Sequence, residues 1–207
     1  MIRGRYFREL FFVLFIFTIL SIGLSSCGLV KQAAEFDRFV KAKFTIHSVK
    51  LNEVAGINFS KTSSARDINF SDVIKLTGAI LKDTLPSTLV LNVEVFNPFD
   101  KEAGVQGMEW KAMQNNLIIA KGNIEKPLLV APHGKVTFPL YVNVNLSKLI
   151  TLKNIQQLFI LFLNKSKPAE ILDKLNITIG IRPYYKFGPE LKKFPDYIII
   201  YPKKPSQ

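Results

Sequence analysis

The chain has 207 residues, 48% of them hydrophobic and 21% charged, and a formal net charge of +12 at pH 7. This hydrophobic content excludes a disordered chain, and a chain of this length can bury roughly 70% of its unfolded surface in a core. One cysteine and two histidines exclude an intrachain disulfide and leave almost no ligands for a metal site, so we expect neither a metal nor another cofactor.

The N-terminal segment indicates export. Three arginines precede an apolar run over residues 10–24. A spanning helix needs about 20 such residues, so this shorter run is typical of a signal peptide. It ends in Leu24-Ser25-Ser26-Cys27, which resembles the bacterial lipobox, whose cysteine becomes a diacylglyceryl thioether. We therefore predict a signal peptide over residues 1–26 and lipidation at Cys27; a signal anchor with a chance cysteine is the alternative.

Lipidation would hold the mature protein on a membrane. A diacylated cysteine, usually with a further N-linked chain of the palmitate type, meets the requirement that stable anchoring takes two signals. No acidic run follows Cys27, so a known surface-export signal is not visible, and we expect an outer-membrane lipoprotein that faces the periplasm. We predict a lipidated tether over residues 27–42, a single domain over residues 43–202 and a basic tail over residues 203–207.

The first half of the domain alternates between apolar and polar residues, as strands do. Alternation begins at Phe44 and changes phase near His47 and Ser48, which predicts a β-bulge. Ser71-Asp72 predicts the start of a short helix, in which Val73, Leu76 and Ile80 would share the apolar side. A cleaner strand runs from about Pro86 to a turn signal at Asn97-Pro98.

The second half predicts further strands and a longer helix. A strand near residues 105–113 would place Met108, Trp110 and Ala112 on one face, and Gly122-Asn123 would turn the chain after the next strand. The clearest alternation spans residues 135–146, with Pro139 on the outward phase, which favours a sheet edge. Ser147 could cap a helix that runs to about Lys165, and strands near residues 176–186 and 197–201 would close the domain.

Short strands separated by turn signals, with one or two helices, predict a mainly β fold, an antiparallel β-sandwich with accessory helices. Seven side chains are expected between the two sheets: Leu91, Val93, Phe138, Leu140, Val142, Ile177 and Ile179.

The order of features over residues 87–149 resembles the late embryogenesis abundant (LEA) group 2 domain, also called the water-stress and hypersensitive-response domain. The matching features are the strand that ends in Asn97-Pro98, a strand that ends in Ile119-Ala120-Lys121-Gly122, the Pro132-x-Gly134 turn, and a long strand that leads into Leu146-Ser147-x-Leu149. The resemblance implies a fibronectin type III-like, immunoglobulin-like sandwich and a stress-linked, non-enzymatic domain without catalytic residues. The lipobox departs from the plant members of this family.

The residues themselves also indicate a protein that is not an enzyme. A Ser-His-Asp triad needs a histidine oriented by a carboxylate, and we expect both His47 and His133 to be solvated. Glu94 and Glu109 lie on outward phases, where a solvated face is expected instead of a paired-carboxylate site. Lysines are scattered along the chain, so their charge serves solubility or attraction to an anionic membrane or glycan; a periplasmic location argues against nucleic acid.

The expected helix after Ser147 has an all-apolar second half over residues 158–163. These side chains would either cover the open end of the sandwich or form an apolar interaction surface that includes Leu158, Leu161 and Phe162. Two functions follow from these alternatives. One is a tethered binding or scaffold module of the cell envelope, which contacts the membrane and an envelope protein or lipid. The other is a carrier or sensor of an apolar ligand such as a lipid.

Overall fold

The computed structural model describes residues 28, 30–60, 69–149, 157, 160–161, 168–187 and 190–201. The expected signal peptide, Cys27 and the basic tail lie outside these residues. Within them, no helix combines the length and the apolar character that crossing a bilayer requires.

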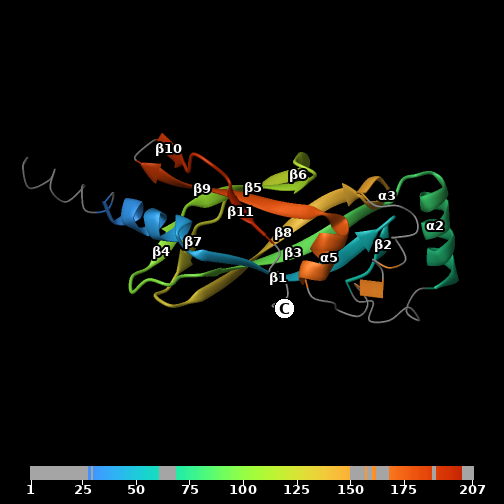
Figure 1. The fold of residues 1–207 in the computed structure, drawn as a ribbon, viewed down its shortest axis with the longest axis horizontal. Coiled ribbons are helices and arrows are strands. Elements are labelled where there is room, and N and C mark those ends of the chain that lie inside the picture. Colours follow the sequence, from blue (N-terminus) through green and yellow to red (C-terminus); the bar gives the residue numbers. More distant parts are fainter. Residues whose placement is uncertain are drawn as a thin grey trace, which may run out of the picture.

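Two antiparallel sheets form the body of the molecule (Figure 1). The first has the strand order β2-β1-β3-β8, and the second has the order β10-β9-β5-β6, with β11 also paired to β9. With β1-β3-β8 taken as strands A-B-E, β10-β9-β5-β6 taken as G-F-C-C′, and β2 added beside β1, this arrangement is a fibronectin type III-like β-sandwich. The first sheet comprises β1 (Lys43–Val54), β2 (Ile57–Asn58), β3 (Pro86–Phe96) and β8 (Lys135–Asn145). The second comprises β5 (Gly107–Gln114), β6 (Leu117–Ile124), β9 (Ile177–Phe187), β10 (Glu190–Lys193) and β11 (Ile198–Ile200).

A small third sheet and several helices complete the described fold. Strands β4 (Ala103–Val105) and β7 (Leu128–Val130) pair with each other at one end of the sandwich. The helices are a segment over residues 30–40, α2 (Phe70–Leu81), α3 (Leu146–Leu149) and α5 (Pro168–Leu175). The expectation of a mainly β sandwich with accessory helices is therefore confirmed.

The core lies between the two main sheets, and alternation along the strands places its side chains there. All seven side chains expected in the core are buried. So are Met108, Trp110 and Ala112, which come from β5 as predicted. Each fully buried aliphatic side chain stabilises the fold by roughly 1.5–3 kcal/mol relative to an exposed one.

Two local irregularities agree with the sequence. The pairing of β1 with β3 shifts register between Ile46 and Ser48, so the bulge lies at His47 as predicted. Strand β8 pairs with β3 alone in its sheet and is therefore an edge strand. Pro139 sits in this edge strand, where its missing N–H leaves no interior hydrogen bond unmade.

The expected turn at Gly122-Asn123 is wrong, because both residues lie inside β6. Gly122 is directly opposite Trp110 on β5, and a Cβ added to the glycine would lie 2.7 Å from Cζ2 of the indole. This glycine therefore provides room for a bulky neighbour instead of turning the chain. The strand expected near residues 105–113 is also interrupted, since Gln106 separates β4 from β5.

The helices differ most from expectation. Helix α2 begins two residues early, because Asn69 is its N-cap and accepts a hydrogen bond from the Asp72 N–H. The alternation pattern did not predict α5, which begins at Pro168, a residue favoured in the first turn, and ends at Leu175. The helix expected over residues 147–165 is described only at α3 and at residues 157, 160 and 161.

Asn97, from the Asn-Pro motif, ties together the end of the sandwich that carries β4 and β7. Its side chain is fully buried, and its Nδ2 lies 2.9 Å from the Lys101 carbonyl and 3.0 Å from those of Val130 and Ala131. Its Oδ1 accepts the Phe99 N–H at 3.1 Å. The Asn-Pro loop is thus hydrogen-bonded to the segment that leads into the Pro132-x-Gly134 turn.

The backbone strengthens the same junction. The Asn97 N–H donates to the Gly134 carbonyl at 3.0 Å, and the His133 N–H donates to the Phe99 carbonyl at 3.3 Å. His133 has a φ of 52°, a left-handed conformation uncommon for a residue with a Cβ. Two motifs that lie about 35 residues apart in the sequence therefore form one structural unit.

We predict that Asn97→Ala lowers the free energy of unfolding by about 2–3 kcal/mol, because buried carbonyls lose their donor. Urea unfolding monitored by tryptophan fluorescence would measure this change. The matched control is Asn123→Ala, which removes an exposed asparagine from β6 and should change stability by no more than about 0.5 kcal/mol. Equal effects of the two substitutions would contradict the role of Asn97.

Candidate functional site

The predicted apolar surface lies only in part among the described residues. Leu158 and Phe162 are outside them. Leu161 is half-buried and packs against the core, as the covering role for this segment requires. Its neighbour Ile160 is 55% exposed. The described part of this segment therefore joins the core at Leu161 and faces outward at Ile160.

Helix α2 carries a larger exposed apolar surface, which the sequence pattern did not assign. Its inner side chains Leu76 and Ile80 are half-buried and pack against the core, as predicted. On the outer side Phe70 is 80% exposed, Ile74 57% and Leu81 82%. These three residues follow a spacing of four and then seven, so they share one face of the helix.

We call the outer face formed by Phe70, Val73, Ile74 and Leu81 the α2 stripe. Val73, which was expected on the inner side, belongs to it and is 47% exposed. A surface helix normally turns a polar face to water, and contiguous exposed apolar side chains mark contact sites. The signal that could have identified the stripe is the spacing of Phe70, Ile74 and Leu81, which repeats at helical intervals on the side away from Leu76.

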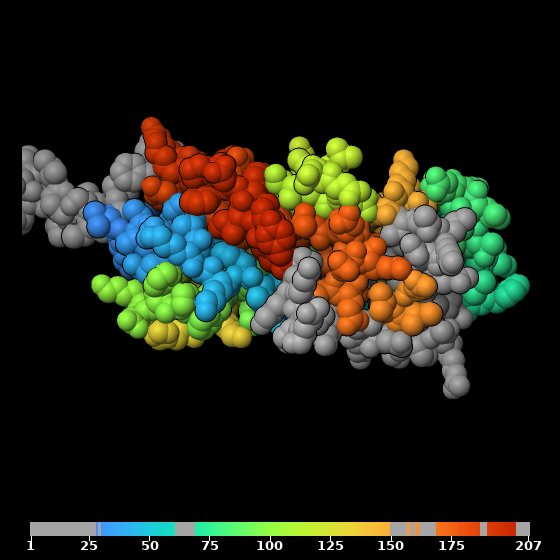
Figure 2. Space-filling view, in the orientation of Figure 1, coloured from blue at the N-terminus to red at the C-terminus, as the bar shows by residue number. Residues whose placement is uncertain are grey.

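The α2 stripe and the N-terminal helix lie at opposite ends of the molecule (Figure 2). The helix over residues 30–40 is fixed to the end that carries β4 and β7, where the Arg38 Nε donates to the Glu102 carbonyl at 2.6 Å. The Phe36 ring also lies 4.6 Å from the Tyr185 ring of β9, measured between centroids. A tether that enters through this helix would therefore leave α2 far from the point of attachment.

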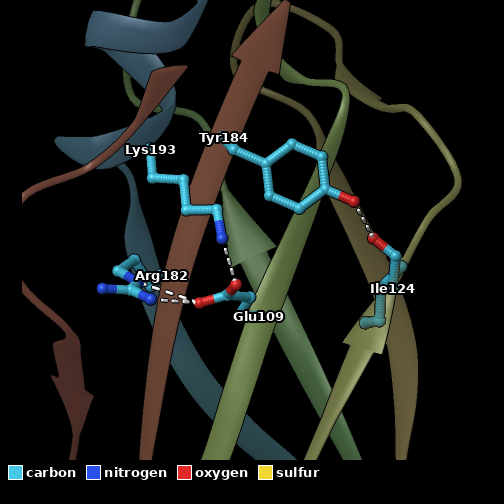
Figure 3. A network of polar contacts seen from close by, with 5 residues as sticks. All are labelled: Glu109, Ile124, Arg182, Tyr184 and Lys193. Carbon is cyan, nitrogen blue, oxygen red and sulfur yellow. Dashed lines mark hydrogen bonds and ion pairs between the residues drawn. The ribbon is translucent and has the colours of Figure 1, made fainter. Parts of the chain in front are cut away.

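A second surface is the outer face of the sheet β10-β9-β5-β6, where a polar network links three strands (Figure 3). Glu109 on β5 accepts a hydrogen bond from the Arg182 Nε of β9 at 2.9 Å and from the Lys193 Nζ of β10 at 2.6 Å. The Tyr184 hydroxyl donates to the Ile124 carbonyl at 3.4 Å. The prediction that Glu109 is simply solvated is therefore wrong, because the carboxylate is held between two cations.

The contacts of these groups shift their pKa values. The hydrogen bond from Lys193, followed by that from Arg182, holds the pKa of Glu109 below its ordinary value of 4.5. The hydrogen bond to Glu109 raises the pKa of Arg182 in turn. Burial, followed by the negative charges of Glu125 and Glu109, raises the pKa of Tyr184. Glu109 is therefore ionised at neutral pH and acts as a cross-link between strands.

An aromatic ring extends the same face toward β6. Tyr197, in the loop before β11, has the Lys111 Nζ 4.0 Å and the Arg182 Cζ 4.9 Å from its ring centroid. Gly180 on β9 leaves room for this stacking, because a Cβ there would lie only 3.3 Å from both the Lys111 Cε and the Tyr197 Cβ. The ring and the two cations lie together on the outside of the sheet.

The two histidines are exposed, as expected. The His133 Nε2 lies 2.8 Å from the Asp100 Oδ1, and the two side chains are 61% and 94% exposed. In water a pair of this kind contributes little to stability. Across the described residues, no three histidine, cysteine or acidic side chains gather into a possible metal site.

Comparisons with known proteins place few constraints on this chain. No family model and no curated protein matches it. One similar solved structure is a protein from Archaeoglobus fulgidus with 15% identity, which covers 55% of this chain and 80% of that chain at a TM-score of 0.31. Another is a protein described as ApaA from Bordetella pertussis, with 8% identity over 79% of this chain and 97% of that chain at a TM-score of 0.34. At these TM-scores neither similarity bears on function.

We predict that Glu109→Gln destabilises the protein at neutral pH and flattens its loss of stability in acid. A folded-state pKa below the ordinary 4.5 means that the carboxylate stabilises the fold above that value. This contribution is lost as the pH falls through the lowered pKa. Urea unfolding at neutral and acid pH measures both effects.

The matched control for this experiment is Glu53→Gln, which neutralises an exposed carboxylate on the opposite sheet. It should leave the stability of the protein at neutral pH nearly unchanged. If Glu109→Gln kept the stability and the acid response of the unsubstituted protein, the Glu109 cross-link would have no energetic role.

Proposed function

We propose that this protein is a bacterial lipoprotein anchored through Cys27, whose LEA group 2-like β-sandwich acts as a non-catalytic binding or scaffold module of the cell envelope. In this proposal the anchor lies in the outer membrane, and the sandwich faces the periplasm and contributes to a stress response. The observation that carries the proposal is the position of the only cysteine, directly after a signal-peptide-length apolar run and two small residues.

The fold supports the lipid anchor by its geometry. The helix over residues 30–40 begins three residues after Cys27 and packs onto the sandwich through Phe36 and Arg38. A lipid on Cys27 would therefore hold one defined end of the molecule at the bilayer. The α2 stripe at the far end would then be presented away from that attachment point (Figure 1).

The resemblance to the LEA group 2 family is supported by the arrangement of its motifs. The Asn-Pro turn and the Pro-x-Gly turn meet through Asn97, and the strand order is the fibronectin type III-like order that the resemblance implies. A non-catalytic role is supported by the use of the polar side chains. Asn97 joins two loops, and Glu109 joins three strands through Arg182 and Lys193.

The test of the anchor is Cys27→Ala in cells fed an alkyne-tagged fatty acid. We expect the unsubstituted protein to incorporate the label and fractionate with membranes, and the variant to lose the label, because alanine has no thiol to acylate. The matched control is Ser25→Ala, which keeps a small residue in the lipobox and should remain labelled. An unlabelled Cys27 protein that stays in membranes would show that residues 10–24 are themselves the anchor.

A second candidate function, a carrier of an apolar ligand such as a lipid, is favoured by the α2 stripe. Its exposed side chains offer a surface on which an acyl chain would lose contact with water. We expect native mass spectrometry of the full chain to detect a retained lipid that Phe70→Ser and Leu81→Ser together remove. The matched control is the exposed, distant Leu129→Ser on β7, which should retain it. No lipid on the unsubstituted chain, or equal retention by the two variants, would exclude the stripe as its site.

A further inference from the structure

The outer face of the sheet β10-β9-β5-β6 carries an excess of positive charge. Glu109 and Lys111 alternate with the buried residues of β5, and their cross-strand partners on β6 and β9 share their face. We call this surface the lysine face. It holds five cations and two carboxylates: Lys111, Lys121, Arg182, Lys186, Lys193, Glu109 and Glu125. The face therefore has a net charge of +3; the nearest further acids in the sequence are Asp196 in the neighbouring loop and Glu190, which pairs with Lys192.

Lys111 on β5 and Lys121 on β6 have no acidic partner among the described residues. Lys111 and Lys121 are directly opposite each other in the β5–β6 pair. Within the described part of the chain, neither comes within ion-pair distance of a carboxylate, whereas Arg182 and Lys193 share Glu109. The Lys111 ammonium lies over the Tyr197 ring, on the β9 side of its strand, so Lys111 and Lys121 present two separate positive charges that a surface of anions can neutralise.

Several side chains of the lysine face are also held in place before any partner binds. Tyr197 and Gly180 fix the stem of Lys111 on the sheet, and the ion pairs of Glu109 fix Arg182 and Lys193. Binding therefore costs little side-chain conformational entropy at these positions. The opposite sheet differs, because its outer positions hold mainly uncharged side chains and one ion pair between Lys135 and Glu94 at 2.9 Å.

A lipid on Cys27 would bring this face near a bilayer. Phe36 of the N-terminal helix lies 4.6 Å from Tyr185 of β9 and 6.4 Å from Phe194, which follows β10, measured between ring centroids. The N-terminal helix therefore packs at the β9–β10 end of this sheet, through side chains of the phase opposite to Arg182 and Tyr184. A sandwich that tilts about this helix would lay the lysine face on the membrane surface.

We propose that the lysine face docks on the phosphate groups of an anionic phospholipid bilayer, with Lys111 and Lys121 as its central contacts. This inference rests on the proposed lipid anchor, which would supply the high local concentration of headgroups. Attraction between basic side chains and an anionic leaflet acts within a Debye length and needs no pocket. The partner is therefore the bilayer that holds the anchor, and the sandwich lies along its surface.

The experiment is lysine footprinting of the full chain reconstituted in nanodiscs. Discs of phosphatidylcholine alone are compared with discs that also contain phosphatidylglycerol, and acetylation of each lysine is followed by mass spectrometry. We expect labelling of Lys111 and Lys121 to slow by at least about threefold in the anionic discs, and to recover in about 1 M salt, where the Debye length is near 3 Å. The exposed Lys50, on the outer face of the opposite sheet, serves as the control and should label equally in all discs.

Two variants test the face itself. Lys121→Glu reverses one exposed charge and should abolish the protection of Lys111 in anionic discs. Lys50→Glu reverses an exposed charge on the other sheet and should leave that protection intact. Unchanged thermal unfolding of both variants would show that the fold is preserved, and footprinting of Lys193 gives a second measure of the same contact.

Several outcomes would overturn the proposal. Equal labelling in neutral and anionic discs would remove the bilayer as partner, and equal protection of Lys50 would indicate general shielding by the disc. Protection in neutral discs on addition of inorganic phosphate would indicate a site for a small anion instead. The mass of the Cys27 peptide, read from the same samples, keeps the two proposals separate: protected lysines with an unmodified Cys27 would support the lysine face and reject the lipid anchor.

Discussion

Strand β3 is the constraint on which the rest of the sandwich depends. It pairs with β1 on one side and with β8 on the other along nearly its whole length. Every second side chain from Ser87 to Val95 is buried, so a slip of one residue would move the apolar set to the solvent face. The register of the first sheet is thus fixed by burial, and the second sheet packs against the inner side chains that this register supplies.

The two ends of the sandwich are closed by different means, and this difference gives the molecule a direction. At one end Asn97 satisfies buried carbonyls, and the N-terminal helix packs beside β4 and β7. At the other end α2 presents apolar side chains to solvent. Hydrogen bonds make the first end rigid, whereas the second end still offers apolar surface whose burial would be favourable.

The outer faces of the two sheets differ in how their charged side chains are paired. On the first sheet, Glu94 and Lys135 pair with each other and most other outward side chains are uncharged. On the second, the charges are positioned by Glu109, Tyr197 and Gly180 and leave two lysines without an acidic partner among the described residues. A protein with one charged face and one apolar end can make two separate contacts, one electrostatic and one hydrophobic.

The sequence alone determined the strands whose alternation is regular, including β3 and β8, the bulge at His47 and the edge position of Pro139, because burial of one face imposes a period of two. It did not predict α5 or β10. The residues of β10 lack alternation and form a strand through backbone pairing with β9, which only the folded neighbour provides. The role of Gly122 was missed for the same reason, since the indole that it accommodates lies on another strand.

The candidate sites also divide into those that local sequence identifies and those that only the tertiary structure decides. Local sequence identified Cys27 as the expected lipidation site, because a lipobox is a contiguous motif. Tertiary structure decided that Glu109 joins three strands, that Lys111 opposes Lys121, and that the two turns of the LEA group 2 resemblance meet at Asn97. Such contacts depend on strand order and register, which bring together residues that no local pattern relates.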